Sequence, residues 1–302
     1  MEIRDIIIPK ELQGVMSLEA QAECRKNARI TLMEAERDVS AILQEVAETY
    51  SHDEIALSLR KIHLVYEGMQ DNGSSLVVPS AYSEGFTLDP ADYFDAQRLV
   101  VIANPNAQTG VELPQAAIEA IVQRNAGSVV VVDEAYVAFG GESALPLTKK
   151  YPNVLVVRTF SKSRSLAGAR LGFAVGSAEL IDDLRRLKFS TNPYSVNRCA
   201  LAAGVAAVKD CAYYEANCAR IAQERERFAA ALRQRGWYLT DSKANFVLAK
   251  PVAGSAPDIA AKLKERGILV RYLGGELSEY LRITIGTAGQ MDALLAALDE
   301  IA

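Results

Sequence analysis

The sequence is poor in the residues that most often bind metals or form disulfide bonds. Its 302 residues include only four cysteines and two histidines. Cys24, Cys199, Cys211 and Cys218 show no C-x-x-C spacing, and the histidines are too far apart to pair on one helix face. We therefore expect no metal site and no disulfide scaffold. The cysteines lie in alanine-rich helical patterns, so we expect them to be small apolar core residues.

The sequence also has no excess of positive charge and no long hydrophobic run. Lysine and arginine number 33 against 38 acidic residues, which gives a net charge of −5. A nucleic-acid-binding protein normally carries a basic face, so that class is not expected. No apolar run approaches the roughly 20 residues that cross a bilayer. The first five residues, Met1–Asp5, are acidic where a secretion signal is basic, so we expect a cytoplasmic location.

The pattern along the chain changes after the first 70 or so residues, which resemble helix. Between residues 98 and 176, short apolar runs alternate with helical stretches, of which Leu113–Asn125 is an example. Apolar runs without alternation predict strands that are buried on both faces, at Leu99–Ala103, Val129–Val132, Val154–Val157 and Phe173–Val175. Such strands, separated by helices such as Ala178–Leu187, predict an α/β fold with a mostly parallel sheet covered by helices.

The last third of the chain predicts a smaller α/β unit. Residues 196–235 are alanine-rich and helical, with a break near Asp210 and an end at Gly236. Beyond them we expect strands and helices in alternation, at 245–248, 257–266, 268–271, 280–284 and 289–301. We place a domain boundary near 207, which divides the chain into a large domain (1–207) and a small domain (208–302).

Polar residues follow each of the first three predicted strands. They are Asn104–Gly110, Asp133–Tyr136 and Arg158–Lys162. In open α/β sheets, ligands bind beyond the carboxyl ends of the strands. We therefore expect the three segments to form one polar site.

Asp133 and Lys162 are the most informative residues of this site. A carboxylate that follows four valines is partly desolvated and needs a cationic or donor partner. Taken alone, Asp133 is explained by a helix N-cap or a salt bridge, and Lys162 by a side chain that reaches water. Together, they match the chemistry of a pyridine aldehyde cofactor. The amine forms a Schiff base, and the carboxylate keeps the ring nitrogen protonated.

Ser161 and Arg170 lie on either side of Lys162 and could bind a phosphate group. The segment between Lys162 and Arg170 is rich in small residues, whose backbone N–H groups are accessible. Hydroxyls, N–H groups and a guanidinium are suited to a phosphate dianion. A serine and an arginine in a surface loop are also common without any such role.

These segments, in this order, resemble the signature of the class II, fold-type I pyridoxal-phosphate aminotransferases. The most similar subfamily is histidinol-phosphate aminotransferase, which Val132–Phe139, Asn192–Tyr194 and Leu281–Thr287 also resemble. The resemblance extends from about Phe86 to the C-terminus. It implies a fold-type I architecture, with a large domain that binds pyridoxal 5'-phosphate and a small C-terminal domain. It also implies a homodimer.

The resemblance implies a role for each matching residue in the large domain. Lys162 is the Schiff-base lysine and carries the proton between the substrate and the cofactor. Asp133 pairs with the pyridine nitrogen, while Tyr136 and Asn106 hydrogen-bond to the ring hydroxyl. Ser161 and Arg170 hold the cofactor phosphate.

Further positions match residues that bind substrate or complete the cofactor site. Arg271 and Arg282 would bind the anionic end of the substrate, and Asn192 is a third candidate for substrate binding. Tyr50 resembles the tyrosine that reaches the cofactor phosphate of the partner subunit, and Ser74 lies in a turn that resembles the phosphate-binding turn. The substrates would be L-histidinol phosphate, as the amino donor, and 2-oxoglutarate.

The sequence departs from the family pattern in two places. Ala107 and Gln108 stand where the family usually has asparagine and proline. The chain is also shorter before Phe86, and residues 1–85 lack the full glycine-rich turn. Tyr82 is a candidate for the aromatic residue that stacks on the ring, or it lies in the strand that normally follows. Two other interpretations therefore stay open. One is a non-catalytic relative that binds or regulates an intact enzyme, and the other is a related enzyme, such as a different aminotransferase or a phospho-amino-acid decarboxylase.

Overall fold

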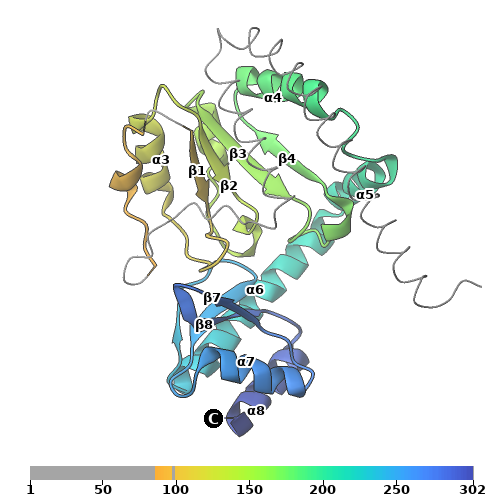
Figure 1. The fold of residues 1–302 in the computed structure, drawn as a ribbon. Helices are drawn as coiled ribbons and strands as arrows, with labels where there is room; N and C mark the ends of the chain where they lie inside the picture. Colours follow the sequence, from red (N-terminus) through yellow and green to blue (C-terminus); the bar gives the residue numbers. More distant parts are fainter. Residues whose placement is uncertain (1–85, 97–98, 302) are drawn as a thin grey trace, which may run out of the picture. The chain divides into compact units, whose positions relative to one another are not determined.

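The computed structural model describes residues 86–96 and 99–301, which form an α/β fold with two separate sheets (Figure 1). The helical expectation for the first 70 residues lies outside these ranges, as do Tyr50 and Ser74. No helix within the described ranges combines the length and the apolar character that crossing a lipid bilayer requires.

The first sheet has the strand order β1-β2-β3-β4. Its strands are β1 (Val100–Ala103), β2 (Val130–Asp133), β3 (Val154–Thr159) and β4 (Gly172–Val175). β1, β2 and β3 run parallel, whereas β4 pairs with β3 in the antiparallel direction. This arrangement confirms the predicted mostly parallel sheet.

Helix α3 (Gln115–Arg124) covers this sheet. Its Ile118, Ile121 and Val122 recur at helical spacing and are fully buried. They belong to one hydrophobic cluster with alternate valines of the strands, Val130 and Val132 among them. In β3, Val154, Leu155 and Val156 are all buried, as the sequence predicts, whereas in β1 and β2 the alternate residues Val101 and Val131 are only partly buried.

The prediction that the fourth strand is buried on both faces is wrong. Phe173, in β4, is 43% exposed, and neither Gly172 nor Phe173 is buried. Among the described residues β4 pairs with β3 alone. An apolar run of this length does not distinguish an interior strand from a strand at the end of a sheet.

Three helices follow the first sheet: α4 (Ala178–Thr191), α5 (Arg198–Lys209) and α6 (Cys211–Gln234). The predicted break at Asp210 is confirmed. Asp210 ends α5 with a non-helical backbone and then caps α6, because its carboxylate accepts a hydrogen bond from the N–H of Tyr213. The domain boundary near 207 falls in the last turn of α5 and stays a prediction.

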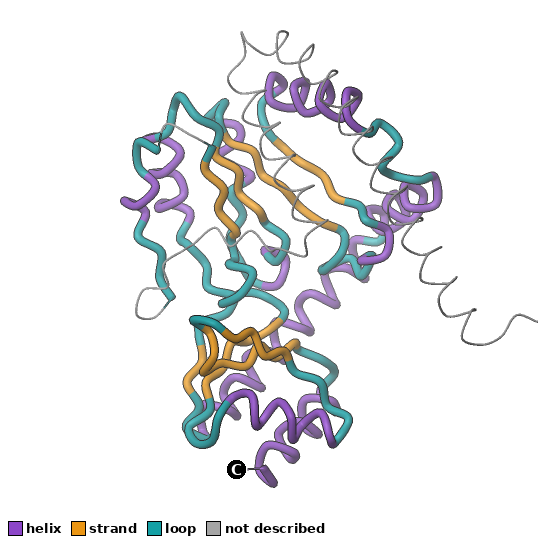
Figure 2. The backbone as a smooth tube through the Cα atoms, in the orientation of Figure 1, coloured by secondary structure: helices purple, strands orange, loops and turns teal. Residues whose placement is uncertain are grey.

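The second sheet has the strand order β5-β6-β8-β7 and is antiparallel throughout. Its strands are among those drawn in orange in Figure 2. Its strands are β5 (Tyr238–Leu239), β6 (Phe246–Lys250), β7 (Arg271–Gly274) and β8 (Leu277–Thr284). β5 is absent from the sequence-based prediction, since two residues are too few to show a period.

Helices α6, α7 (Ala256–Glu265) and α8 (Ala288–Ile301) cover one face of the second sheet. Leu281 and Ile283 of β8 belong to the hydrophobic cluster that these helices form. Because successive side chains of a strand alternate between faces, Arg282 lies on the opposite face of the sheet.

The predicted strand at 268–271 is displaced toward the C-terminus. The N–H groups of Gly267 and Ile268 donate hydrogen bonds to the carbonyls of Lys264 and Leu263, and Gly267 has a φ of +77°. These two bonds form a helix-ending motif that uses the backbone of Ile268. The strand therefore begins only at Arg271.

The expectation that the cysteines are core residues holds for only one of those described. Cys218 is buried, whereas Cys199 and Cys211 are exposed, and Cys24 lies outside the described residues. Cys211 is the first residue of α6, and the first buried residue of this helix is Cys218. An alanine-rich helix carries apolar residues all around it, so composition alone does not identify its buried face.

Candidate functional site

The loops that follow β1, β2 and β3 lie at the same edge of the first sheet, as is required by the parallel direction of these strands. Two backbone hydrogen bonds extend the pairing into the loops. The N–H of Asn104 donates to the carbonyl of Asp133 (2.8 Å), and the N–H of Glu134 donates to the carbonyl of Val157 (2.8 Å). The three polar segments identified in the sequence therefore begin side by side.

Asp133 is the last residue of β2 and has a partly buried side chain. Its Oδ1 accepts a hydrogen bond from the N–H of Ala135 (3.0 Å). Burial raises the pKa of the Asp133 carboxyl, the nearby charge of Glu134 raises it further, and the positive charge of Lys162 lowers it.

Tyr136 connects the loop after β2 with the loop after β3. The Nζ atom of Lys162 lies 5.7 Å from the centroid of the Tyr136 ring. Tyr136 is 7% exposed, and its hydroxyl has no hydrogen-bond partner among the described residues. Lys162 is exposed, and its ammonium forms no ion pair within the described part of the chain. The structure therefore brings Tyr136 and Lys162, two of the three predicted catalytic residues, together at the edge where the third, Asp133, ends β2, and it leaves two polar groups open to a ligand.

The second sheet contributes Phe246 and Arg282 to the same site. The rings of Tyr136 and Phe246 meet edge to face, with their centroids 5.3 Å apart. The guanidinium of Arg282 lies 4.2 Å from the centroid of the Phe246 ring, and its Nη1 donates to the carbonyl of Ala107 (3.0 Å). A continuous row of contacts thus extends from Lys162 to Arg282.

The loop that follows β1 is held in shape by two asparagines. The buried Asn104 accepts a hydrogen bond from the N–H of Leu113 (2.7 Å) and donates to its carbonyl (3.1 Å), which closes the base of the loop. The Oδ1 of Asn106 accepts from the N–H groups of Gln108 and Thr109. The side-chain oxygen of Asn106 is thus occupied, and its Nδ2 has no partner among the described residues.

A pocket of about 320 Å³ borders this loop. Asn106, Thr109 and Glu112 line it together with mainly apolar side chains. Glu112 accepts a hydrogen bond from the backbone N–H of Glu142, and burial raises the pKa of the Glu112 carboxyl. The pocket is large enough for a small molecule.

The segment before β6 holds the other side of the loop. The hydroxyl of Thr240 donates to the carbonyl of Thr109 (2.7 Å), and the N–H of Lys243 donates to the carbonyl of Gly110 (2.8 Å). Gly110 has a φ of +74°, and a Cβ atom there would lie 2.1 Å from the Oγ of Ser242. Only glycine therefore permits this close approach.

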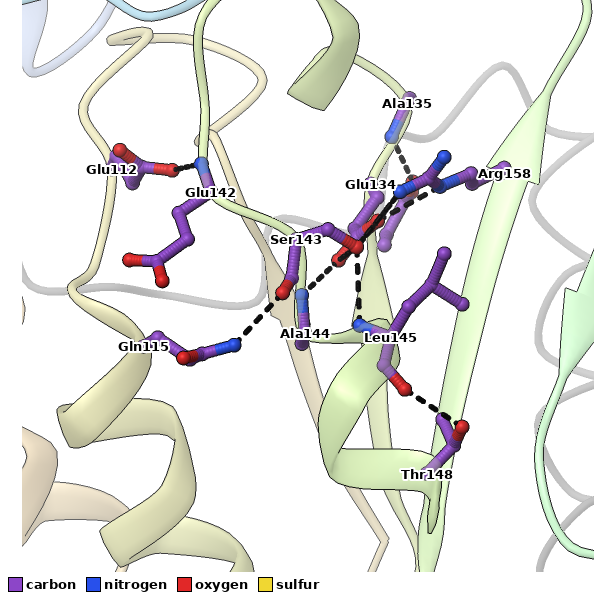
Figure 3. A network of polar contacts seen from close by, with 11 residues as sticks. Glu112, Gln115, Glu134, Ala135, Glu142, Ser143, Ala144, Leu145, Thr148 and Arg158 are labelled. Carbon is purple, nitrogen blue, oxygen red and sulfur yellow. Dashed lines mark hydrogen bonds and ion pairs between the residues drawn. The ribbon is translucent and has the colours of Figure 1, made fainter.

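Glu134, which is buried, and Arg158, which is partly exposed, form an ion pair that connects the ends of β2 and β3 (Figure 3). The carboxylate of Glu134 accepts from Nε (2.9 Å) and lies 2.7 Å from Nη2 of Arg158. It also accepts from the hydroxyl of Ser143 and the N–H of Ala144. This network fixes the two strand ends that carry Asp133 and Lys162.

The loop between β3 and β4 contains Ser161, Arg164 and Arg170. The N–H of Ser161 donates to the hydroxyl of Thr159 (3.0 Å), and the Ser161 hydroxyl has no partner among the described residues. Arg164 packs over the ring of Tyr214 (4.0 Å to the centroid), which attaches the loop to α6. Arg170 is exposed in a left-handed turn, and no contact joins it to Ser161 or Lys162 within the described residues.

The other predicted site residues are placed as follows. Arg271 is paired directly with Arg282 across β7 and β8, so the two arginines share one face of the sheet. Asn192 ends α4, where its Oδ1 accepts from the N–H of Tyr194 (3.1 Å), and nothing in the described part of the chain joins it to Lys162. Tyr50 and Ser74 lie outside the described residues.

Sequence reasoning missed Phe246, the Glu134–Arg158 pair and the buried Arg225 of α6. Arg225 could have been identified from the sequence, because helical spacing places it on the same apolar face of α6 as Phe228 and Leu232. A charged residue at a core position of a helix indicates a specific partner. In the described ranges, no group of three or more histidine, cysteine, aspartate or glutamate residues is placed to hold a metal ion.

The chain is similar to known proteins over most of its length. The model of the family "Aminotransferase class I and II" matches residues 52–298. "Histidinol-phosphate aminotransferase 1" of Hydrogenovibrio crunogenus is 48% identical over 220 residues, which are 72% of this chain and 62% of that protein. The chain thus spans less than two thirds of the length of this curated relative.

Solved structures show the same fold. The histidinol-phosphate aminotransferase of Sinorhizobium meliloti, solved in complex with pyridoxal-5'-phosphate, has a TM-score of 0.59 and is 30% identical, over 67% of this chain and 57% of that chain. The histidinol-phosphate aminotransferase of Clostridium acetobutylicum has a TM-score of 0.69 at 24% identity, over 78% and 74% of the two chains. The architecture predicted from the sequence is confirmed.

Proposed function

Since the chain belongs to the class I and II aminotransferase family, we propose that it is a pyridoxal-phosphate-dependent aminotransferase. Its substrates would be L-histidinol phosphate and 2-oxoglutarate, and its products imidazole acetol phosphate and L-glutamate, in histidine biosynthesis. The single observation that carries the proposal is the approach of the Lys162 Nζ to the ring of Tyr136, in the loop that directly follows Asp133 at the end of β2. The curated relative named histidinol-phosphate aminotransferase supports the choice of substrate.

The donor set suits a phosphorylated pyridine aldehyde. When bound, pyridoxal phosphate supplies an aldehyde carbon that reacts with amines and a ring that accepts the electron pair of a broken bond. Asp133 has one oxygen on the N–H of Ala135 and a second oxygen without a partner among the described residues. That oxygen would accept a hydrogen bond from the protonated ring nitrogen, and the positive charge of the ring would offset the cost of burying the carboxylate.

Tyr136 and Asn106 offer two further donors at the same edge. The buried Tyr136 hydroxyl and the Asn106 Nδ2 have no partner within the described ranges, and an unsatisfied buried donor costs free energy. Both would donate to the ring oxygen. Lys162 would carry the catalytic amine, and its Nζ would hold and deliver the proton that leaves the substrate carbon.

Anionic groups would be bound at the two ends of the site. Ser161 and Arg170 would hold the cofactor phosphate, with Tyr50 and Ser74 as further candidates that rest on the resemblance alone. Arg282 and Arg271, on one face of the second sheet, would bind the phosphate or carboxylate of the substrate. Asn192 is retained as a substrate-binding candidate on the same resemblance.

We propose that the chain forms a homodimer through α5. Leu201, Val205 and Val208 recur at helical spacing on one face of α5 and are 51%, 56% and 49% exposed. A contiguous apolar face of this kind indicates a binding surface. The cytoplasmic location stays a prediction.

The test is covalent capture of the cofactor. The purified protein mixed with pyridoxal phosphate should turn yellow, and borohydride should fix one cofactor on Lys162. Lys162→Ala should lose this adduct, whereas Lys149→Ala, at an exposed lysine on a surface turn, should keep it. If the wild-type protein forms no adduct, the enzymatic proposal is wrong and the non-catalytic interpretation gains support.

The substrate is identified by adding amino donors to the yellow protein. Histidinol phosphate should remove the colour at lower concentration than glutamate or aromatic amino acids, and 2-oxoglutarate should restore it. Release of carbon dioxide from a phosphorylated amino acid, without transfer of its amino group, would instead identify a decarboxylase.

A further inference from the structure

Arg225 of α6 is a buried cation whose main partners are backbone carbonyls. It is 4% exposed. Its Nη1 donates to the carbonyl of Phe139 (2.7 Å) and to the carbonyl of Ala244 (2.8 Å). Its Nε and Nη2 donate to Glu226, which is largely exposed. Arg225 therefore joins α6 to two segments that are distant in the sequence.

Both carbonyls are close in the chain to the aromatic rings of the site. Phe139 ends the short 3₁₀ turn that begins directly after Tyr136. Ala244 lies two residues before Phe246, the first residue of β6. The same residues pack into one small cluster with Cys218, so the rings and the two carbonyls form a single unit.

The chemistry of an arginine explains why this residue occupies a core position. Two carbonyls from separate segments need a donor that reaches both, and the guanidinium provides several N–H groups in a fixed plane. An apolar residue would leave both carbonyls without this donor. Nη1 serves both carbonyls, and a lysine, with one nitrogen in place of three, would have no separate donors for Glu226.

We propose that Arg225 is a positioning residue for the site. By fixing Phe139 and Ala244, it sets the edge-to-face contact of Tyr136 and Phe246, and through Phe246 it places Arg282 against the carbonyl of Ala107. It thereby aligns the group that would bind the substrate anion with the groups that would bind the cofactor. The role of Arg225 in substrate binding rests on the proposed function, whereas its effect on the packing of Phe246 does not.

The coupling is tested on the protein without cofactor. Arg225→Met, Phe246→Leu and the double variant are unfolded in urea, and Arg225→Lys replaces Arg225→Met in the cycle if the latter does not fold. The loss in the free energy of unfolding that Phe246→Leu causes should be about half as large when Arg225 is already replaced. The reason is that substitutions within one network of contacts do not have additive effects on stability. The matched control is Arg235→Met, since Arg235 caps the C-terminal end of α6 and bonds to a carbonyl and a carboxylate. Arg235→Met and Phe246→Leu should be additive, and an additive cycle with Arg225 would overturn the proposal.

The consequence for substrate is tested on the loaded protein. Arg225→Lys should still form the Lys162 adduct, but its apparent affinity for histidinol phosphate should fall by about tenfold or more, with a smaller change in the maximal rate of colour loss. Arg235→Met should keep the wild-type affinity. If Arg225→Lys and Arg235→Met lose the same affinity for histidinol phosphate, Arg225 has only a general structural role and the proposal is overturned. A wild-type protein that forms no adduct would refute the proposed function, and the unfolding cycle would still decide the coupling.

Discussion

The Glu134–Arg158 pair yields a prediction about which of its two partners the fold needs more. The side chain of Glu134 is 1% exposed, whereas that of Arg158 is 25% exposed. Arg158→Met leaves a carboxylate buried with only Ser143 and Ala144 as donors. Glu134→Gln leaves a guanidinium that reaches water. The two substitutions break the same ion pair, but they leave very different charges behind.

The expected magnitudes follow from this asymmetry. Removal of one partner of a fully buried pair costs about 3–5 kcal/mol. Because Arg158 is partly exposed and two neutral donors remain on Glu134, we expect Arg158→Met to cost about 2–4 kcal/mol. Glu134→Gln loses charge-assisted hydrogen bonds but leaves no buried charge, so we expect about 1–2 kcal/mol. The double variant should be more stable than Arg158→Met alone.

The assay is urea unfolding, monitored by circular dichroism, of the wild-type protein, the two single variants and the double variant. Midpoints and slopes give the free energy of unfolding of each variant. Arg124→Met is a suitable control, since Arg124 and its partner Asp95 are each 57% exposed, and it should cost less than about 1 kcal/mol. If Glu134→Gln costs as much as Arg158→Met, or if the double variant is less stable than either, the explanation by an uncompensated buried carboxylate is refuted.

Two further predictions concern the proposed cofactor site and the proposed dimer. Burial raises the pKa of the Asp133 carboxyl above its unfolded value, so its charge destabilises the folded protein at neutral pH, and this cost disappears as the pH falls through the raised pKa. Without cofactor, Asp133→Asn should therefore unfold at higher urea than the wild-type protein at pH 7, with a smaller difference at acidic pH; a less stable variant at pH 7 would contradict this sign. Val205→Asp, on the exposed face of α5, should convert a dimer into monomers in sedimentation experiments while Lys209→Ala, at the end of the same helix, keeps the dimer. A wild-type protein that sediments as a monomer would refute the dimer.

Much of the fold followed from local patterns, because those patterns report burial directly. The valines of β2 and β3 and the spacing of Ile118, Ile121 and Val122 predicted the layers that the structure contains. The break at Asp210 was also local, since a capping side chain acts on the next turn of the same chain. The prediction failed at 268–271, where the same residues can either end a helix or begin a strand. There the N–H of Ile268 bonds to the end of α7 and does not take part in a strand.

The candidate site divides in the same way. The residues that follow each apolar run, Asp133, Tyr136 and Lys162 among them, were readable in the amino-acid pattern, and parallel strands must present such residues at one edge. The residues of the second sheet that meet them were visible only in the folded chain. The bond from Arg282 to Ala107 joins positions 175 residues apart, and that from Arg225 to Phe139 joins positions 86 residues apart. The physical reason is that a periodic pattern records whether a side chain is buried, whereas the identity of its partner depends on how distant segments pack.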